Sequence, residues 1–109
     1  MSNDAHMLDR LYATVLGRKG ADPNSSYTAK LYSKGSQKIA QKVGEEAVEL
    51  SIAAALKDRD ETILESADLL YHLTVLWADA GVDPAEIYAK LADREGLSGL
   101  AEKAARSTK

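Results

Sequence analysis

Two pairs of acidic residues lie near the middle of this 109-residue sequence, and the members of each pair are three positions apart. Glu46 and Glu49 form the first pair, and Glu65 and Asp68 form the second. Residues three apart project from the same side of an α-helix, so each pair presents two carboxylates on one helix face. Carboxylate oxygens are the ligands that Mg²⁺ and Mn²⁺ prefer. The spacing therefore predicts a divalent-cation site if two helices bring the pairs together.

A helical hairpin would bring these pairs together. The sequence predicts a long helix from Ser36, as its N-cap, to about Lys57, and a second from Asp60, as its N-cap, to just before Gly81. Because only residues 58–60 connect them, the two helices are expected to pack antiparallel. The four carboxylates would then converge and raise each other's pKa values by repulsion, a conflict that a bound cation resolves.

The acidic residues fall on an apolar background. On a helical pattern Glu49 lies among Ile52, Ala53 and Leu56, where a core residue is expected. The alternative is a solvated acidic face, which is the ordinary explanation for a single pair of acids on a helix. Two pairs on consecutive helices favour the metal site.

One histidine, His72, follows Asp68 by one helical turn. A ferritin-like di-iron site would need Glu-x-x-His, but the third residue after Glu65 is Asp68. We therefore interpret His72 as a core histidine that is hydrogen-bonded to a neighbour, with metal ligation as the alternative.

Lysines recur every four residues before the first acidic pair, at Lys30, Lys34, Lys38 and Lys42. Gly35 interrupts the helical periodicity, so these lysines cannot lie on one continuous helix. We expect them to bind phosphates beside the metal site, and Lys42, one turn before Glu46, is the best placed. The alternative is a set of solvated lysines on an amphipathic surface.

Three hydroxyl side chains, those of Ser26, Tyr27 and Thr28, precede the lysines. Ser26 suits the N-cap of a short helix over residues 27–33. We expect all three to contribute to substrate binding, and the Tyr27 ring could stack on a base.

The rest of the chain also predicts helices and no strands. Further helices are expected over residues 4–16, 84–96 and 98–106, and a loop over residues 17–26. The helix after Asp83 has three start signals, since Asp83 suits the N-cap, Pro84 the first helical position and Glu86 the third. The fold class is therefore all-α, a helical bundle built on the long antiparallel hairpin. We expect one domain over residues 1–109, with a frayed tail over residues 98–109.

The second long helix is apolar around nearly its whole circumference. Its apolar residues are Ile63, Leu64, Ala67, Leu69, Leu70, Leu73, Val75, Leu76 and Trp77. Such a helix must be covered on several sides, and a chain of this length offers few helices to cover it. A homodimer that buries one face and completes the bundle is the expectation, with a monomeric bundle as the alternative.

Composition excludes several classes of protein. The absence of cysteine excludes a disulfide scaffold, a zinc–thiolate site and an iron–sulfur centre. No run of about 18 or more apolar residues is present, and the first residues lack an apolar signal core, so a cytoplasmic protein without a membrane partner is expected. The net charge of −3 is not that of a nucleic-acid binder. Basic residues prevail over residues 1–44 and acids over residues 45–68, which suits a site for a phosphorylated substrate and a metal.

Three segments strongly resemble the phosphoribosyl-ATP pyrophosphohydrolase family. They are Ser-Tyr-Thr-Ala-Lys-Leu at 26–31, Lys-Val-Gly-Glu-Glu-Ala-Val-Glu at 42–49 and Glu-Ser-Ala-Asp-Leu-Leu-Tyr-His at 65–72. The acids match the Glu-Glu-x-x-Glu and Glu-x-x-Asp pattern of the wider MazG-like all-α nucleotide pyrophosphohydrolase superfamily. The resemblance extends roughly from Leu8 to Arg94.

This resemblance implies hydrolysis of 1-(5-phosphoribosyl)-ATP to 1-(5-phosphoribosyl)-AMP and pyrophosphate, a step of histidine biosynthesis. It implies that Mg²⁺, or Mn²⁺, is held by Glu46, Glu49, Glu65 and Asp68. Either Glu45 or Glu49 would orient and deprotonate the attacking water, and the sequence leaves that choice open. Lys42 and the lysines before it, with Arg94 as a weaker candidate, would bind the triphosphate and the additional 5′-phosphate.

Two other functions remain open at this point. One is a housecleaning pyrophosphohydrolase that acts on a canonical or damaged nucleoside triphosphate with the same metal chemistry. The other is a non-catalytic, metal-binding helical bundle.

Overall fold

The computed structural model describes residue 4 and residues 6–95 of the chain, and this part is all-helical, without a strand. Its helices are α1 (Met7–Leu16), α2 (Tyr27–Lys34), α3 (Ser36–Ala55), α4 (Arg59–Ala80) and α5 (Pro84–Asp93). The all-α prediction is therefore confirmed. None of the described helices is long and apolar enough to cross a membrane. The helix predicted over residues 98–106 and the frayed tail lie outside the described residues.

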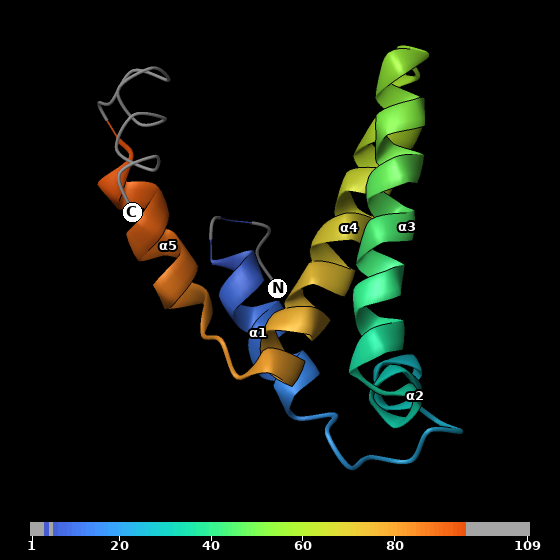
Figure 1. Ribbon diagram of the computed structural model, residues 1–109, viewed down its shortest axis with the longest axis vertical. Coiled ribbons are helices and arrows are strands. Elements are labelled where there is room, and N and C mark those ends of the chain that lie inside the picture. Colours follow the sequence, from blue (N-terminus) through green and yellow to red (C-terminus); the bar gives the residue numbers. More distant parts are fainter. Residues whose placement is uncertain (1–3, 5, 96–109) are drawn as a thin grey trace.

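Helices α3 and α4 form the predicted antiparallel hairpin and pack against each other along their length (Figure 1). The turn between them has the expected three residues but lies two residues earlier, at residues 56–58. Helix α3 ends at Ala55, and Lys57 takes a left-handed conformation with φ of 58°. The backbone N–H of Asp58 then donates to the carbonyl of Ala53, a bond that satisfies one of the last helical acceptors.

The predicted N-cap of α4 was wrong. Asp58, in an extended conformation, caps the helix, and its side chain accepts a hydrogen bond from the backbone N–H of Glu61 at 3.1 Å. Asp60 lies inside the first turn instead. Both residue types suit an N-cap, and the position at which α3 ends selects Asp58.

Gly35 separates α2 from α3 and has a φ of 92°, a conformation that favours glycine. The predicted break in the run of lysines is thus confirmed. The predicted N-cap Ser36 was wrong, because Ser36 is the first residue of α3 and makes no capping bond. Its hydroxyl donates to Oδ2 of Asp79 at 2.6 Å and so ties the start of α3 to the end of α4.

The hydrophobic core lies at the end of the hairpin where α1 and α2 pack against it, the lower end in Figure 1. Its buried members are Val15, Leu31, Ile39, Val75 and Ala78. The hydroxyl of Tyr32 donates to the carbonyl of Val15 at 2.9 Å and fixes α2 to α1. Helices α1 and α2 therefore pack on the base of the hairpin, and the acidic pairs lie above it.

Helix α5 begins with the predicted capping box. The Asp83 side chain accepts a hydrogen bond from a backbone N–H of the first turn, and the Glu86 side chain accepts one from the backbone N–H of Asp83. The helix stands apart from the hairpin (Figure 1) and packs against α1, where the hydroxyl of Tyr88 donates to Oδ1 of Asp9 at 3.1 Å. It ends at Asp93, earlier than expected.

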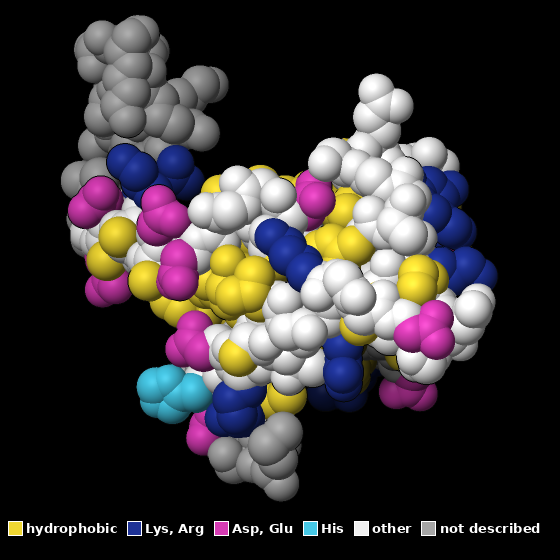
Figure 2. Space-filling view, turned by 90° about the horizontal axis from the view of Figure 1, so that it is seen from below, with side chains coloured by type: hydrophobic (Ala, Val, Ile, Leu, Met, Phe, Trp, Pro, Cys, Tyr) yellow, Lys and Arg dark blue, Asp and Glu magenta, His cyan; other side chains and the backbone are white. Residues whose placement is uncertain are grey.

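The free half of the hairpin exposes apolar side chains. The exposed ones are Val48, Ile52 and Leu56 on α3 and Ile63, Leu64 and Leu70 on α4. Figure 2 shows that hydrophobic side chains also reach the surface in the middle of the face seen from below. The apolar circumference of α4 is thus covered by its own chain only in part.

Candidate metal centre

Three carboxylates from the two hairpin helices converge. Glu46 and Glu49 on α3 and Glu65 on α4 each offer one oxygen, and these oxygens all lie within 4.8 Å of one another. The i, i+3 spacing places the two α3 residues on the face that packs on α4, and the antiparallel hairpin brings Glu65 to the same height. The structure therefore brings together three of the four predicted metal ligands.

The cluster is electrostatically unfavourable without a cation. Glu46 is buried, with 8% of its surface exposed, and its Oε2 has no hydrogen-bond partner among the described residues. The same is true of Oε2 of Glu65. Burial raises the pKa of Glu46, and the neighbouring Glu49 carboxylate raises it further. Burial, followed by the charge of Glu49, raises the pKa of Glu65 to about 7.

These features suit a divalent cation. Buried polar atoms in a native fold almost always have a partner, and one oxygen each of Glu46 and Glu65 lacks one among the described residues. Oxygen donors that carry negative charge are the set that Mg²⁺ and Mn²⁺ take, and a cation between them would remove the repulsion. The acidic cluster could therefore bind a metal ion.

Asp68, the fourth predicted ligand, lies outside this group of three. Its charge still acts on the cluster, because it contributes to the raised pKa of Glu65. Its backbone carbonyl is the acceptor for Nδ1 of His72, at 2.9 Å. The interpretation of His72 as a buried histidine bonded to a neighbour is confirmed.

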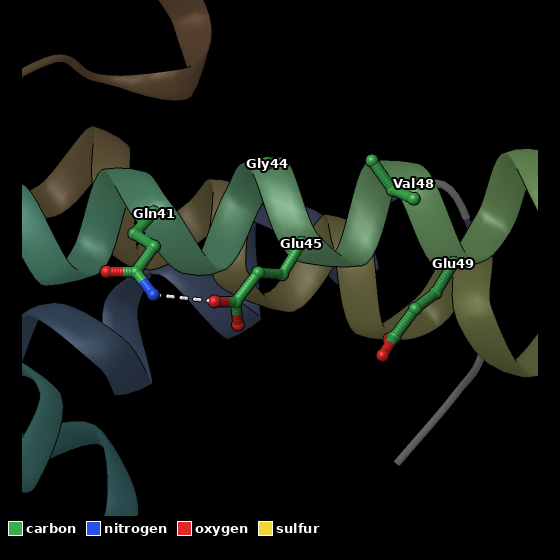
Figure 3. Close-up of a pocket in the computed structure, with 5 residues that line it drawn as sticks. All are labelled: Gln41, Gly44, Glu45, Val48 and Glu49. Carbon is green, nitrogen blue, oxygen red and sulfur yellow. Dashed lines mark hydrogen bonds between the residues drawn. The ribbon is translucent and has the colours of Figure 1, made fainter.

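Glu45 lies outside this group of three carboxylates and is held by two neighbours. Nε2 of Gln41 donates to its Oε2 at 2.6 Å (Figure 3), and Nζ of Lys42 lies 3.3 Å from its Oε1. The bond from Gln41, followed by that from Lys42, holds the pKa of Glu45 below its ordinary value. Sequence reasoning missed Gln41, although its position four residues before Glu45 was the signal.

Lys42 lies between Glu45 and the acidic cluster of Glu46, Glu49 and Glu65. Its ammonium lies 3.8 Å from Oε1 of Glu46, at the position that the sequence suggested for a phosphate ligand. Lys38 lies close enough to contribute to the lowered pKa of Glu45. Lys30 and Lys34 lie on the exposed surface of α2.

Two grooves adjoin Glu49 on opposite sides. One, of about 580 Å³, runs along α3 past Gln41, Gly44, Glu45 and Val48 (Figure 3). The other, of about 310 Å³, leads to the turn of the hairpin. It is lined by Glu49, Ile52, Ala53, Leu56, Asp58, Glu61 and Glu65. Glu49 thus lies beside Ile52, Ala53 and Leu56 as predicted, but Glu49, Ile52 and Leu56 are exposed, so the expected core position was wrong.

The hydroxyl residues at the start of α2 have partners within the fold. The Ser26 hydroxyl caps α2 by accepting from the backbone N–H of Ala29 at 3.1 Å. The buried Thr28 hydroxyl bonds the hydroxyl of Tyr71 on α4. The Tyr27 side chain remains half exposed, so its ring is accessible to a ligand.

Arg94, the weakest of the predicted phosphate ligands, caps the C-terminus of α5. Since α5 stands apart from the hairpin (Figure 1), the chain does not bring Arg94 to the acidic cluster. The sequence could not place this residue, because its position depends on how α5 packs on α1.

Comparison with known proteins agrees with this arrangement. A family model described as phosphoribosyl-ATP pyrophosphohydrolase matches residues 8–95. The phosphoribosyl-ATP pyrophosphatase of Azospirillum brasilense is 65% identical over 104 residues, which cover 95% of this chain and 94% of the relative. That of Paramagnetospirillum magneticum is 55% identical over 109 residues and covers both chains in full.

A third relative shows a similar level of likeness. The phosphoribosyl-ATP pyrophosphatase of Parvibaculum lavamentivorans is 58% identical over 106 residues, which cover 97% of each chain. The family match and these full-length relatives agree with the convergent carboxylates of the all-helical fold. The chain belongs to the phosphoribosyl-ATP pyrophosphohydrolase family.

Proposed function

We propose that this chain hydrolyses 1-(5-phosphoribosyl)-ATP to 1-(5-phosphoribosyl)-AMP and pyrophosphate in the biosynthesis of histidine. The observation that carries the proposal is the convergence of Glu46, Glu49 and Glu65 on the hairpin of a chain that belongs to this family. Hydrolysis of a triphosphate needs a centre that offsets negative charge, and an acidic cluster with a cation provides one.

Glu46, Glu49 and Glu65 would hold Mg²⁺, or alternatively Mn²⁺, and Asp68 is proposed as a fourth ligand. The two unpartnered carboxylate oxygens support this assignment. The cation supplies positive charge that stabilises the triphosphate as its bridging bond breaks. The carboxylates would fix the position of the cation, and through it that of the triphosphate, because they lie on the two packed helices of the hairpin.

Glu49 is our candidate for the general base. In the proposed step a water oxygen attacks the α-phosphorus. The bond between the α-phosphorus and the oxygen that bridges it to the β-phosphorus breaks, and pyrophosphate leaves with the bonding electrons. The proton of the water passes to a Glu49 oxygen. Glu45 is less suited because Gln41 and Lys42 hold its carboxylate and its pKa is lowered.

Lys42 is proposed to bind the triphosphate, because its ammonium lies 3.8 Å from Oε1 of Glu46 in the acidic cluster. Lys38 is proposed to assist it, and Lys30 and Lys34 to serve the 5′-phosphate at a greater distance, whereas Arg94 is not included because it lies at the end of α5, apart from the hairpin. Ser26 and Thr28 shape the start of α2, and Tyr27 presents its ring to the base. In this proposal the Lys42 ammonium exchanges the carboxylate oxygens of Glu45 and Glu46 for phosphate oxygens, to which it can donate in the same way.

A homodimer in the cytoplasm is part of the proposal. The exposed side chains of Val48, Ile52 and Leu56 recur along one stripe of α3, and α4 adds Ile63 and Leu70 beside it. Contiguous apolar surface of this kind is typical of an interface between subunits. Sedimentation at several concentrations tests it, and a monomer at every concentration would contradict it.

A comparison of substrates tests the activity itself. We expect kcat/KM for phosphoribosyl-ATP to exceed that for ATP, dUTP and dCTP by about 100-fold or more, because a site with charged groups for the extra phosphate discriminates strongly. Preference for an ordinary or damaged nucleoside triphosphate would instead identify a housecleaning enzyme. No Mg²⁺-dependent release of pyrophosphate from any of them would leave the non-catalytic bundle.

A further inference from the structure

Both ring nitrogens of the buried His72 are engaged. Nδ1 lies 2.9 Å from the carbonyl oxygen of Asp68, one turn earlier on α4. Nε2 lies 3.4 Å from the hydroxyl of Tyr27, the first residue of α2. His72 is 7% exposed, so no solvent competes strongly for either nitrogen.

The first of these contacts fixes the chemistry of the second. A backbone carbonyl can only accept a hydrogen bond, so Nδ1 of His72 must carry the proton. In the neutral imidazole Nε2 then has a free lone pair, and the Tyr27 hydroxyl donates to it. The distance of 3.4 Å is long for such a bond.

The Tyr27 ring is packed on one side and open on the other. It stacks on Tyr71 with ring centroids 6.2 Å apart and planes at 27°, and it meets the edge of His72 at 83°. The Thr28 hydroxyl bonds the hydroxyl of Tyr71 and anchors the same turn of α2 to α4. Half of Tyr27, 52%, is nevertheless exposed.

The Tyr27 hydroxyl lies near enough to Lys42, the proposed phosphate ligand, to act on its pKa. Burial lowers the pKa of Lys42, but its hydrogen bond to Glu45 and then the nearby Tyr27 raise it above its ordinary value. Lys42 itself lies 3.8 Å from Glu46. A nucleotide whose phosphates reach Lys42 would therefore bring its base or sugar within reach of Tyr27.

We propose that His72 is a positioning residue that holds the Tyr27 hydroxyl, and so fixes the plane of the Tyr27 ring against the purine base of the substrate. This inference rests on the proposed function, because the ligand it invokes is the nucleotide. His72 does not contact the substrate in this role, although its Nδ1 bonds the backbone carbonyl of Asp68, a proposed metal ligand. Its effect passes through one hydrogen bond to a residue on a different helix.

The first test needs no substrate. In the ¹⁵N-labelled chain at about pH 8, well above the ordinary histidine range, we expect His72 to carry its proton on Nδ1 and not on Nε2. In Tyr27→Phe the Nε2 resonance is expected to shift because it loses its donor. A proton on Nε2, or an unchanged resonance in Tyr27→Phe, would overturn the inference.

The second test compares His72→Gln, His72→Asn and Tyr27→Phe in steady-state hydrolysis of phosphoribosyl-ATP. Glutamine places an oxygen near the position of Nε2 and can accept from Tyr27, whereas asparagine reaches only the position of Nδ1. We expect His72→Asn and Tyr27→Phe to raise KM about threefold to tenfold, the range that one hydrogen bond controls, with kcat little changed. His72→Gln should keep KM near that of the unmodified chain.

The double variant decides whether His72 acts through Tyr27. If it does, His72→Asn combined with Tyr27→Phe raises KM no further than either change alone. Additive effects, or equal losses in His72→Gln and His72→Asn, would refute the inference. Tyr88→Phe, which removes a tyrosine hydrogen bond to Asp9 on the far helices, is the control and should leave KM unchanged.

The outcomes separate the two claims. If the unmodified chain does not turn over phosphoribosyl-ATP, the proposed function fails, and the role of His72 towards that substrate fails with it. If the unmodified chain is active and the variants equal it, the proposed function stands and the inference is wrong. Tyr27→Phe keeps the ring, so a folding defect in the His72 variants cannot hide the result.

Discussion

Glu46 on α3 and Glu65 on α4 bring carboxylate oxygens within 4.8 Å of each other, and each keeps a buried oxygen with no hydrogen-bond partner among the described residues. Both carboxyl groups have raised pKa values for the same first reason, burial. The hairpin thus holds acids where their ionised forms are unstable, which is a pattern typical of functional sites. A bound cation would stabilise those ionised forms.

Glu65→Gln is expected to stabilise the metal-free chain and to remove its response to Mg²⁺. The substitution keeps the shape of the side chain but removes the charge that Glu49 and Glu46 repel. Thermal unfolding in EDTA should therefore occur at a higher temperature than in the unmodified chain, while added Mg²⁺ should raise the melting temperature of the unmodified chain only. Equal Mg²⁺ responses in both would show that Glu65 holds no metal.

The stability of the metal-free chain should fall as the pH rises from about 4.5 to about 7. The folded chain holds a proton on Glu65 up to a pKa of about 7, whereas the unfolded chain releases it near the ordinary value of 4.5. Unfolding therefore releases a proton in this window, and a higher pH favours it. Above the window the contribution of Glu65 is constant.

The comparison with Glu65→Gln isolates this effect from other carboxyl groups. The difference in melting temperature between the two chains in EDTA should grow in favour of the variant from pH 5 to pH 7 and then level off. Mg²⁺ should stabilise the unmodified chain more at pH 8 than at pH 5, because its carboxylates must be ionised to bind it. A difference that stays constant with pH would contradict the raised pKa.

Glu49→Gln and Glu45→Gln are a matched pair on one helix. Glu49 shares the cluster with Glu46 and Glu65, whereas Glu45 is paired with Gln41 and Lys42. We expect Glu49→Gln to lower kcat about 100-fold or more, since it removes a proposed base and metal ligand. Glu45→Gln should lower kcat less than about tenfold.

Asp68→Asn should abolish Mg²⁺-dependent release of pyrophosphate while the chain stays folded.

Initial rates at saturating Mg²⁺ with circular dichroism on each variant check this prediction. The reverse order, in which Glu45→Gln is the more damaging change, would transfer the role of base to Glu45. That choice was open in the sequence because both residues occupy one acidic run, and the side-chain bonds of Glu45 are what separate them.

Contacts between residues of neighbouring helices joined by a short turn could be predicted from the sequence, whereas contacts that depend on how distant helices pack could not. The approach of Glu46, Glu49 and Glu65 follows from i, i+3 spacing and one short turn. The bond between Tyr27 and His72 joins residues 45 positions apart, so it depends on how α2 docks on α4. No local pattern encodes that docking.

The caps show the same division at shorter range. The box formed by Asp83 and Glu86 was predicted because proline and two acids give one consistent start signal. At the hairpin turn two aspartates compete, and the left-handed Lys57 decides between them. Its φ of 58° is set by closure of the turn and not by its residue type.

Asp58→Ala and Asp60→Ala therefore should differ in stability, which is the last prediction. Asp58 accepts the backbone N–H of Glu61, and loss of such a cap costs about 1 kcal/mol. For a chain of this size that corresponds to a fall of roughly 4–8 °C in melting temperature. Asp60 lies in the first turn, where its charge favours the helix by only about 0.3–1 kcal/mol at low salt.

Salt distinguishes these two contributions. The effect of Asp60→Ala should shrink towards zero in about 1 M NaCl, because the interaction of an exposed charge with the helix end is screened. The effect of Asp58→Ala should persist, because it removes a directional hydrogen bond as well as a charge. If Asp60→Ala is the more destabilising change at high salt, then Asp60 caps α4 in solution and the turn of the hairpin lies two residues later than the structure has it.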